Sequence, residues 1–194
     1  MTALRITGGT LRGRRVPIPK RGGDLRPTSE RARQAYFNIV GARVDGARFL
    51  DLFAGTGIFS FEALSRGAES SVAIDLAGAQ IAAIEQLATE WELSIRSIRA
   101  DALTGIKRLR STVFDLVFAD PPYAYDSYDA LLLAIDESIT LADDAVIAIE
   151  HRRHAEPFTA TTGRLRLSRR AEYGEVWISF FTTASAGNDD DDAA

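Results

Sequence analysis

Asp120, Pro121, Pro122 and Tyr123 come directly after an apolar run, residues 113–119, that is typical of a buried strand. Because proline has no backbone N–H, this turn offers only acceptors, a carboxylate and carbonyl oxygens, beside a flat ring. Such a set suits a planar group that carries an NH2, for example the exocyclic amine of a nucleobase. The carboxyl edge of an open α/β sheet is also where ligands bind. The alternative interpretation is an ordinary strand-ending turn with a surface tyrosine.

A glycine-containing turn, residues 54–57, joins the apolar segment 48–53 to a helical segment. Glycines let the backbone approach a ligand closely, and a helix N-terminus favours negative charge. Asp75 ends the next predicted strand, where an acid can accept both hydroxyls of a ribose. Asp101 follows a third strand and is placed to accept a hydrogen of an adenine amino group. Acids at successive strand ends suit a neutral or cationic adenosine compound. The turn is poorly suited to bind a pyrophosphate, because Ser60 occupies the position of the third glycine in the Gly-x-Gly-x-x-Gly motif.

The elements that must position these residues alternate along the chain. Strands are expected at 48–53, 71–75, 95–100, 113–119 and 145–150, and helices at 58–66, 77–93, 102–109 and 128–136. Strands that alternate with helices indicate a doubly wound, mostly parallel α/β sheet. Two further alternating segments, 164–172 and 175–182, predict a closing antiparallel hairpin, which makes the sheet seven-stranded.

The N-terminal region differs from this core in its charge. Residues 1–48 hold eleven Arg or Lys against three acids, a net charge of +8, whereas the whole chain carries -4. Segments 4–9 and 14–19 predict a small β-hairpin, and a helix is expected to follow from Thr28 or Ser29. A basic extension on an acidic body suggests a polyanionic partner, and the planar fork of arginine suits phosphate.

We therefore expect three regions. Residues 1–46 form a basic hairpin and helix, residues 47–183 form the core, and residues 184–194 are too polar to bury apolar surface and should be disordered.

Composition excludes several functional classes. The 194 residues include no cysteine, which rules out disulfides, thiolate metal sites and a cysteine nucleophile. No apolar run reaches the length of a membrane span and the N-terminus lacks the pattern of a signal peptide, so we expect a cytoplasmic protein. His151 and His154 are spaced like metal ligands on a helix, but they follow a strand and have no third partner, so a solvated pair and no metal are expected. Glu150 ends the fifth core strand and is assigned no role.

Residues 51–57, Asp75, Asp101 and residues 120–123 together resemble the class I S-adenosylmethionine-dependent methyltransferases that act on exocyclic amines, which share a Rossmann-like fold. Over residues 4–183 the chain more closely resembles the bacterial 16S rRNA guanine-N2 methyltransferases of the RsmD type. The matching motifs are Arg5-Ile6-x-Gly8-Gly9, Arg12-Gly13-Arg14, Arg26-Pro27-Thr28, Arg31-x-Arg33, Phe37-Asn38, residues 62–67 and Tyr173-Gly174. Asp75 is a departure, since that family more often has Glu at this position.

The resemblance implies transfer of a methyl group from S-adenosylmethionine to the N2 amine of a guanine in 16S rRNA. The name of the RsmD-type family assigns this guanine as guanine 966, and the implied substrate is the small ribosomal subunit or its precursor. A monomer is expected. Asp120 and the Pro121 carbonyl would each accept one amine hydrogen, and Tyr123 would stack on the base. The implied cofactor contacts are Asp51, Phe53, Ala54, Gly55, Thr56, Gly57, Asp75, Leu76, Asp101, Ala102 and Asp120. The implied RNA contacts are Arg5, Arg12, Arg14, Arg15, Arg26, Thr28, Arg31 and Arg33.

Three other functions fit parts of this pattern. A DNA adenine-N6 or cytosine-N4 methyltransferase also uses Asp-Pro-Pro-Tyr, but residues 123–145 leave no room for a sizeable target-recognition insertion. A protein-glutamine methyltransferase usually has Asn where this chain has Asp120. A non-catalytic RNA-binding module on a degenerate core is the third alternative, and the intact acids and glycines argue against it.

Overall fold

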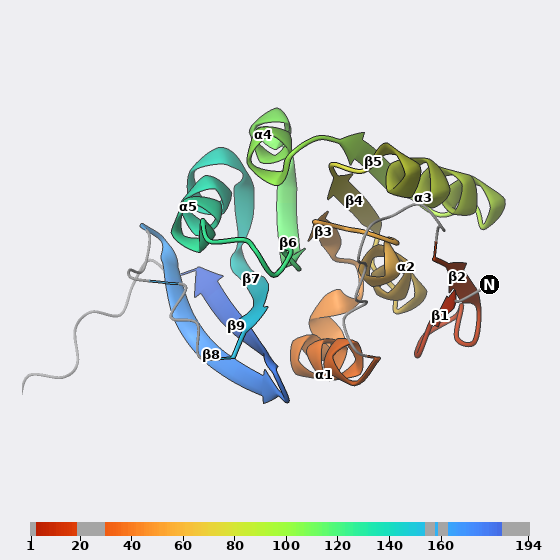
Figure 1. Ribbon diagram of the computed structural model, residues 1–194, viewed down its shortest axis with the longest axis horizontal. Coiled ribbons are helices and arrows are strands. Elements are labelled where there is room, and N and C mark those ends of the chain that lie inside the picture. Colours follow the sequence, from red (N-terminus) through yellow and green to blue (C-terminus); the bar gives the residue numbers. More distant parts are fainter. Residues whose placement is uncertain (1–2, 19–29, 154–157, 159–162, 184–194) are drawn as a thin grey trace, which may run out of the picture.

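The computed structural model describes residues 3–18, 30–153, 158 and 163–183. Figure 1 shows a central sheet with helices on both faces. The elements in chain order are β1 (Ala3–Arg5), β2 (Arg15–Pro17), α1 (Glu30–Val40), η1 (Gly41–Val44), β3 (Arg48–Leu52), α2 (Ile58–Ser65), β4 (Ser70–Asp75), α3 (Gly78–Glu90), β5 (Ile95–Arg99), α4 (Ala102–Ile106), η2 (Lys107–Leu109), β6 (Val113–Ala119), α5 (Tyr128–Ser138), β7 (Thr140–Arg152), β8 (Leu165–Tyr173) and β9 (Val176–Thr183). Among the described residues, no helix is long and apolar enough to cross a membrane.

The main sheet has seven strands in the order β5-β4-β3-β6-β7-β9-β8. The first five strands of this order are parallel, whereas β9 runs antiparallel to both β7 and β8. The predicted fold class, a doubly wound and mostly parallel sheet that ends in an antiparallel hairpin, is therefore confirmed. This order places β3, β4 and β6 side by side, so their carboxyl ends share one edge.

Side chains of the central strands enter two apolar clusters, one on each face of the sheet. Leu50 and Leu52 pack with α4, η2 and α5, whereas Phe49 packs with α1, α2 and α3. This period of two follows from the strand pleat. In β6 the same alternation places Phe118 on the α1 face. Asp120, two residues further along, is therefore expected to project from that face too.

The small N-terminal sheet, β1 with β2, packs against the core through two apolar residues. Ile6 and Val16 are fully buried in the same cluster as α1 and α2. The end of α2 also holds the loop between the two strands, because Thr10 N donates to the Ser65 carbonyl at 2.7 Å and Leu11 N to Ser65 Oγ at 2.9 Å. The predicted hairpin is confirmed, although each strand has only three paired residues.

Glu62 on α2 anchors this hairpin through a buried carboxylate. The backbone N–H of Thr7 donates to both carboxylate oxygens, at 3.1 and 2.9 Å, and the Thr7 hydroxyl also donates to it. Arg66 contributes a salt bridge of 2.8 Å. Because Glu62 itself is fully buried, the basic hairpin is fixed to the core at this point. The division of the chain at residue 46 remains a prediction.

Arg33 is also part of this buried contact. Its side chain is 1% exposed, it donates to the Arg5 carbonyl at 2.9 Å, and its Nε lies 3.7 Å from a Glu62 oxygen. Burial lowers the pKa of the Arg33 guanidinium, and the nearby Glu62 opposes that change. The expectation that Arg33 contacts RNA is therefore wrong, because its face of α1 turns toward α2 rather than solvent.

The strand β7 is longer than expected at both ends. It begins at Thr140, where it pairs with the start of β6 before a register shift between Phe114 and Leu116. At its other end it continues to Arg152, paired with Val176 of β9.

Two predictions concern residues outside the described part of the chain. These are the disorder expected for residues 184–194 and the helix cap expected at Thr28 or Ser29.

Candidate functional site

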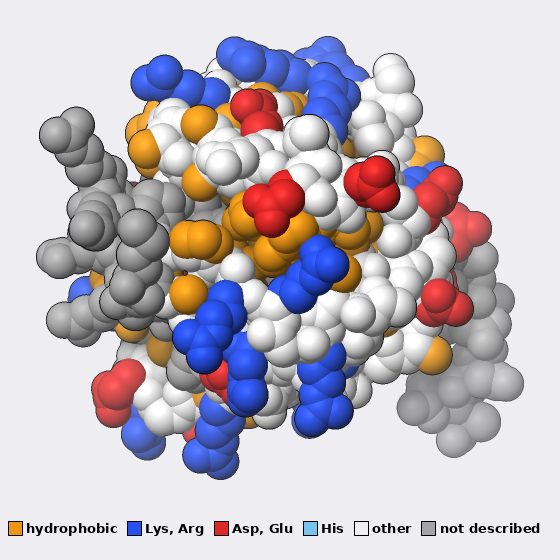
Figure 2. Space-filling model, turned by 90° about the vertical axis from the view of Figure 1, so that its right-hand side faces the viewer, with side chains coloured by type: hydrophobic (Ala, Val, Ile, Leu, Met, Phe, Trp, Pro, Cys, Tyr) orange, Lys and Arg blue, Asp and Glu red, His pale blue; other side chains and the backbone are white. Residues whose placement is uncertain are grey.

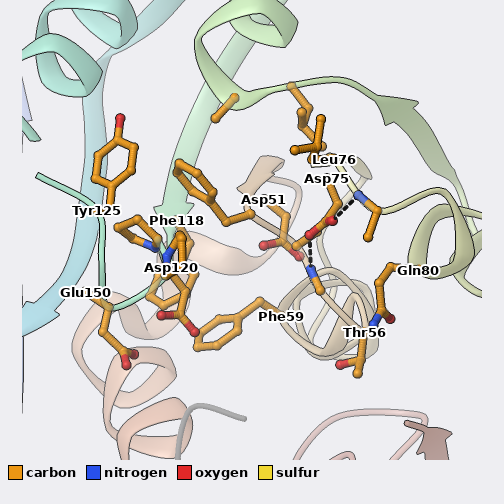
Figure 3. Close-up of a pocket in the computed structure, with 18 of the residues that line it drawn as sticks. Asp51, Thr56, Phe59, Asp75, Leu76, Gln80, Phe118, Asp120, Tyr125 and Glu150 are labelled. Carbon is orange, nitrogen blue, oxygen red and sulfur yellow. Dashed lines mark hydrogen bonds between the residues drawn. The ribbon is translucent and has the colours of Figure 1, made fainter. Parts of the chain in front are cut away.

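A cavity of about 480 Å³ opens at the carboxyl ends of β3, β4, β6 and β7 (Figure 3). It brings together nearly every residue for which the sequence predicts cofactor binding or catalysis; of these, only Gly57 is absent from its wall. The predicted residues that line it are Asp51, Phe53, Ala54, Gly55, Thr56, Asp75, Leu76, Asp101, Ala102, Asp120, Pro121 and Tyr123.

The turn between β3 and α2 has the backbone conformation that its glycines favour. Gly55 and Gly57 have φ of 53° and 74°, and Phe53 also has a positive φ of 58°. A Cβ on Gly57 would lie 2.8 Å from Ile84 Cγ1, so α3 can approach the turn only because this position has no side chain. Gly57 thus shapes the turn from behind, while Gly55 and Thr56 face the cavity.

Asp51 is buried in the floor of the cavity, with 2% of its surface exposed. Ser60 at the start of α2 donates to one carboxylate oxygen twice, from its N–H at 3.1 Å and its hydroxyl at 2.7 Å. Burial raises the pKa of Asp51 to about 8; the Ser60 hydrogen bonds act in the opposite direction, and Asp120 and Asp75 add to the rise. Ser60, which replaces the third glycine of a dinucleotide motif, therefore has a role as the anchor of Asp51.

Asp75 at the end of β4 connects the turn to the next helix. One carboxylate oxygen accepts the N–H of Gly55 and the other accepts the N–H of Ala77, each at 2.8 Å (Figure 3). Each carboxylate oxygen can accept a second hydrogen bond, so the group fits a ribose diol while it also orders the turn. The neighbouring Leu76 is 69% exposed, which places an apolar side chain at the rim of the cavity.

Asp101 after β5 has a structural role that the sequence interpretation omitted. It is the N-cap of α4, and its Oδ1 accepts the N–H of Leu103 at 3.0 Å and that of Thr104 at 3.3 Å. Substituting an N-cap residue commonly costs about 1 kcal/mol of helix stability. The carboxylate also lines the cavity, so helix capping and ligand binding are compatible at this position.

The turn after β6 has the acceptor character that its prolines predict. The Pro122 carbonyl accepts the N–H of Tyr125 at 2.8 Å, which closes a tight turn behind Asp120 and Pro121. Tyr123 is 45% exposed, and the guanidinium carbon of Arg152 lies 4.8 Å from its ring centre. A cation–π contact therefore already occupies one face of the ring.

The end of β7 contributes Glu150, His151 and Arg152 to the cavity wall. His151 is 3% exposed, its Nε2 lies 2.8 Å from Ser179 Oγ, and burial lowers its pKa. The expectation of a solvated histidine pair is therefore wrong for His151, because β7 extends past it and pairs with β9. His154 lies outside the described residues. The described part of the chain holds no group of three side chains suited to a metal ion.

Gln80 and Leu4 are examples of cavity residues that carried no functional signal in the sequence. Gln80 on α3 is 1% exposed, and both polar atoms of its amide lack a hydrogen-bond partner among the described residues. Figure 3 shows it beside Thr56. Leu4 of β1 reaches the cavity from the N-terminal hairpin. A glutamine within an amphipathic helix and a leucine within a short strand resemble ordinary packing residues, so pattern alone could not identify them.

Those arginines expected to contact RNA that the structure describes lie apart from the cavity wall. Arg12, Arg15 and Arg31 are exposed, as is Arg14, whose guanidinium lies 5.1 Å from the Trp91 ring centre. Arg5 is also exposed and lies 3.6 Å from Glu30. Figure 2 looks onto the side of the molecule that carries β1 and β2 and shows Lys and Arg side chains along its upper edge and lower part. Arg26 and Thr28 lie outside the described residues.

Comparison with known proteins gives relatives along nearly the whole chain. A Bacillus subtilis protein named "Putative rRNA methyltransferase YlbH" is 34% identical over 182 residues, which cover 92% of this chain and 98% of that protein. The "Ribosomal RNA small subunit methyltransferase D" of Escherichia coli strain K12 is 30% identical over 190 residues, 97% of this chain and 94% of the relative.

A solved structure shares both the fold and the sequence pattern. The structure titled "Putative methyltransferase yhhF from Escherichia coli" is 30% identical in sequence and superposes with a TM-score of 0.82. The match covers 95% of this chain and 99% of the chain in that structure. A family model described as "Conserved hypothetical protein 95" matches residues 4–182. The match spans the basic hairpin, the cavity and the C-terminal strands, so the chain belongs to the Conserved hypothetical protein 95 family.

Proposed function

We propose that this protein transfers a methyl group from S-adenosylmethionine to the N2 amine of a guanine in 16S rRNA, which the resemblance to RsmD-type methyltransferases implies is guanine 966. One observation carries the proposal: the acceptor-only turn at Asp120 and Pro121 lines the same cavity as three strand-end acids. The arrangement occurs in a chain that is 30% identical to the small subunit methyltransferase D of E. coli along almost its full length.

The cofactor part of the cavity fits an adenosine compound with a positive charge. Asp75 is placed for the ribose hydroxyls and Asp101 for the adenine amino group, while Leu76 can cover the adenine ring. Asp51 and the Gly55–Thr56 backbone face the remaining, methionine part. S-adenosylmethionine supplies an electrophilic methyl group on a sulfonium, and the buried Asp51 carboxylate, when ionised, favours this cation because it lowers its electrostatic energy.

The Asp120 turn fits the amine that accepts the methyl group. The lone pair of guanine N2 is delocalised into the ring, which makes the amine a weak nucleophile. When Asp120 and the Pro121 carbonyl each accept one N–H, the nitrogen can rehybridise and direct its lone pair toward the methyl group. Tyr123 offers a ring for the base to stack on, beside Arg152. Proton loss follows methyl transfer, with Asp120 or water as the acceptor.

We place the RNA on the side of the molecule that carries the basic hairpin. Arg12, Arg14 and Arg15 are exposed there on a hairpin that Glu62 fixes to the core, and one of its residues, Leu4, reaches the cavity. Phosphate contacts of this kind position a nucleic acid, while the cavity selects the base. We further propose that a monomer acts in the cytoplasm on the small ribosomal subunit or its precursor.

The DNA alternative has less support in the structure. Between Asp120 and β7 the chain forms only a turn and α5, whose apolar face is buried against the sheet. No described segment in this interval extends from the core to read a DNA groove. The non-catalytic alternative would leave the Asp51, Asp75 and Asp101 carboxylates in one cavity without a ligand for them.

The direct test compares 16S rRNA from cells with and without this gene by mass mapping. The proposal predicts one guanine that carries a methyl group only when the gene is present, with the methyl on N2. Restoration of that modification in vitro, by purified protein and labelled S-adenosylmethionine, would establish that this protein is sufficient. Identical maps from both strains would contradict the proposal.

A further inference from the structure

Glu150 at the end of β7 lies next to Asp120 on the same side of the sheet. In the β6–β7 ladder Ala119 pairs with Ile149, so Asp120 and Glu150 occupy the next position of this parallel register. Neighbouring strands are about 4.8 Å apart, and residues in register project to the same face. Figure 3 shows both side chains turned toward the same part of the cavity. Glu150 also lines that cavity, and only 7% of its surface is exposed.

Asp120 and Glu150 also both lie within electrostatic range of Tyr128, another residue of the cavity wall. Burial raises the pKa of the Tyr128 hydroxyl, and the charges of Asp120 and Glu150 raise it further, whereas Arg152 lowers it. Ile178 of β9 pairs with Glu150 on its other side and is fully buried, so the carboxylate has an apolar surface behind it. Glu150 consequently faces the part of the cavity where the Asp120 turn receives the base.

The two carboxylates match a feature that distinguishes guanine from the other bases with exocyclic amines. In guanine the N2 amine is flanked by N1–H, a second donor on the same edge. In adenine and cytosine the ring nitrogen beside the amine carries a lone pair and accepts hydrogen bonds. An acceptor next to the amine-binding turn would therefore bind guanine and repel the ring nitrogen of the other two bases.

We infer that Glu150 accepts the N1–H of the target guanine and so sets the specificity of the site for guanine over adenine and cytosine. The inference rests on the proposed function, because it assigns the second hydrogen bond of the base whose amine Asp120 holds. It also accounts for a buried carboxylate at the end of β7, where the sequence pattern gave no role. A site built to pair a donor rejects a base that lacks it, because the buried acceptor is then left without its partner.

The test combines one substitution in the protein with one in the RNA. Small subunits are reconstituted with 16S rRNA that carries either guanine or 2-aminopurine at the methylated position. 2-Aminopurine keeps the N2 amine but has a lone pair on N1 in place of the N–H. Wild-type protein should methylate guanine at least about tenfold more efficiently in kcat/KM, since a lost hydrogen bond to a charged group commonly costs that factor. In Glu150→Gln, whose amide can donate to N1, the preference should fall toward one.

Three controls keep the result specific. Glu172→Gln removes an exposed carboxylate from β8 and should leave the preference unchanged. S-adenosylmethionine affinity, measured by calorimetry, and the melting temperature report whether Glu150→Gln disturbs the cofactor site or the fold. Any difference in reactivity between the two amines applies equally to both proteins, so it cancels when their preferences are compared.

The outcomes separate this inference from the function on which it rests. Wild-type protein that methylates neither RNA would overturn the proposed function and this inference with it. Wild-type activity on guanine, with the same preference in Glu150→Gln, would overturn the role of Glu150 alone. Weaker cofactor binding as the main effect of Glu150→Gln would also overturn it, because the residue would then belong to the cofactor site.

Discussion

Replacing Glu62 by Gln should destabilise the protein strongly, because its carboxylate joins the basic hairpin to α2. Glu62 is fully buried and accepts hydrogen bonds from Thr7 and Arg66. Its carboxylate also neutralises the buried guanidinium of Arg33, which is 1% exposed and whose Nε lies 3.7 Å from Glu62 Oε2. Breaking a buried ion pair on one side costs about 3–5 kcal/mol. In a domain of this size each kcal/mol lowers the melting temperature by about 2–4 °C, so we expect a decrease of roughly 6–20 °C.

Glu30→Gln is the matched control for this experiment. Glu30 also pairs with an arginine of the N-terminal region, Arg5 at 3.6 Å, but both side chains are substantially exposed. An exposed pair contributes about 0–1 kcal/mol, so this variant should melt within a few degrees of wild type. Equal melting temperatures for the Glu30 and Glu62 variants would refute the claim that the buried carboxylate fixes the hairpin to the core.

Three further predictions concern ligand binding. Asp75→Ala should weaken S-adenosylmethionine binding more than tenfold in calorimetry, since the ribose and the Gly55 N–H both lose their acceptor; unchanged affinity would exclude the ribose role. Changing Arg12, Arg14 and Arg15 together to Ala should preserve cofactor affinity but reduce the slope of log RNA affinity against log salt by about two, if three phosphate contacts on single-stranded RNA are lost; equal slopes would show that RNA binds elsewhere. Burial raises the pKa of Asp51 to about 8, and a bound sulfonium should lower this pKa because it favours the ionised carboxylate. The ratio of the affinity for S-adenosylmethionine to that for S-adenosylhomocysteine should therefore rise between about pH 6 and pH 8, by up to about tenfold per pH unit. The product shares the titrating amino group but lacks the sulfonium, and a constant ratio across this range would contradict the coupling.

The core and the position of the site were predictable because their signals are local. Strands with apolar residues on both faces, such as residues 113–119, have few alternative structures, and the acids that follow such strands meet at one edge of a parallel sheet. The glycine turn was predictable for a similar reason, since the positive φ of Gly55 and Gly57 restricts the residue type.

The features that the sequence missed depend on packing between distant segments. Arg31 and Arg33 look alike in sequence, but only the side of α1 that packs on α2 buries a guanidinium. The sequence placed His151 after the end of a strand, and only its pairing with Trp177 of β9 shows that it lies within β7. In the sequence Ser60 was notable only because it replaces the third glycine of a dinucleotide motif. The structure gives a reason for the serine, because its hydroxyl donates a hydrogen bond to Asp51.

The most direct test of the account is methyl transfer by Asp120→Ala to small subunits from cells that lack the gene. Because Asp120 is proposed to hold the amine most strongly in the transition state, turnover should fall at least about a hundredfold, while S-adenosylmethionine affinity changes by less than about threefold. Calorimetry with the same preparation supplies the cofactor affinity. Turnover above a few per cent of wild type would contradict the proposed catalytic role of Asp120.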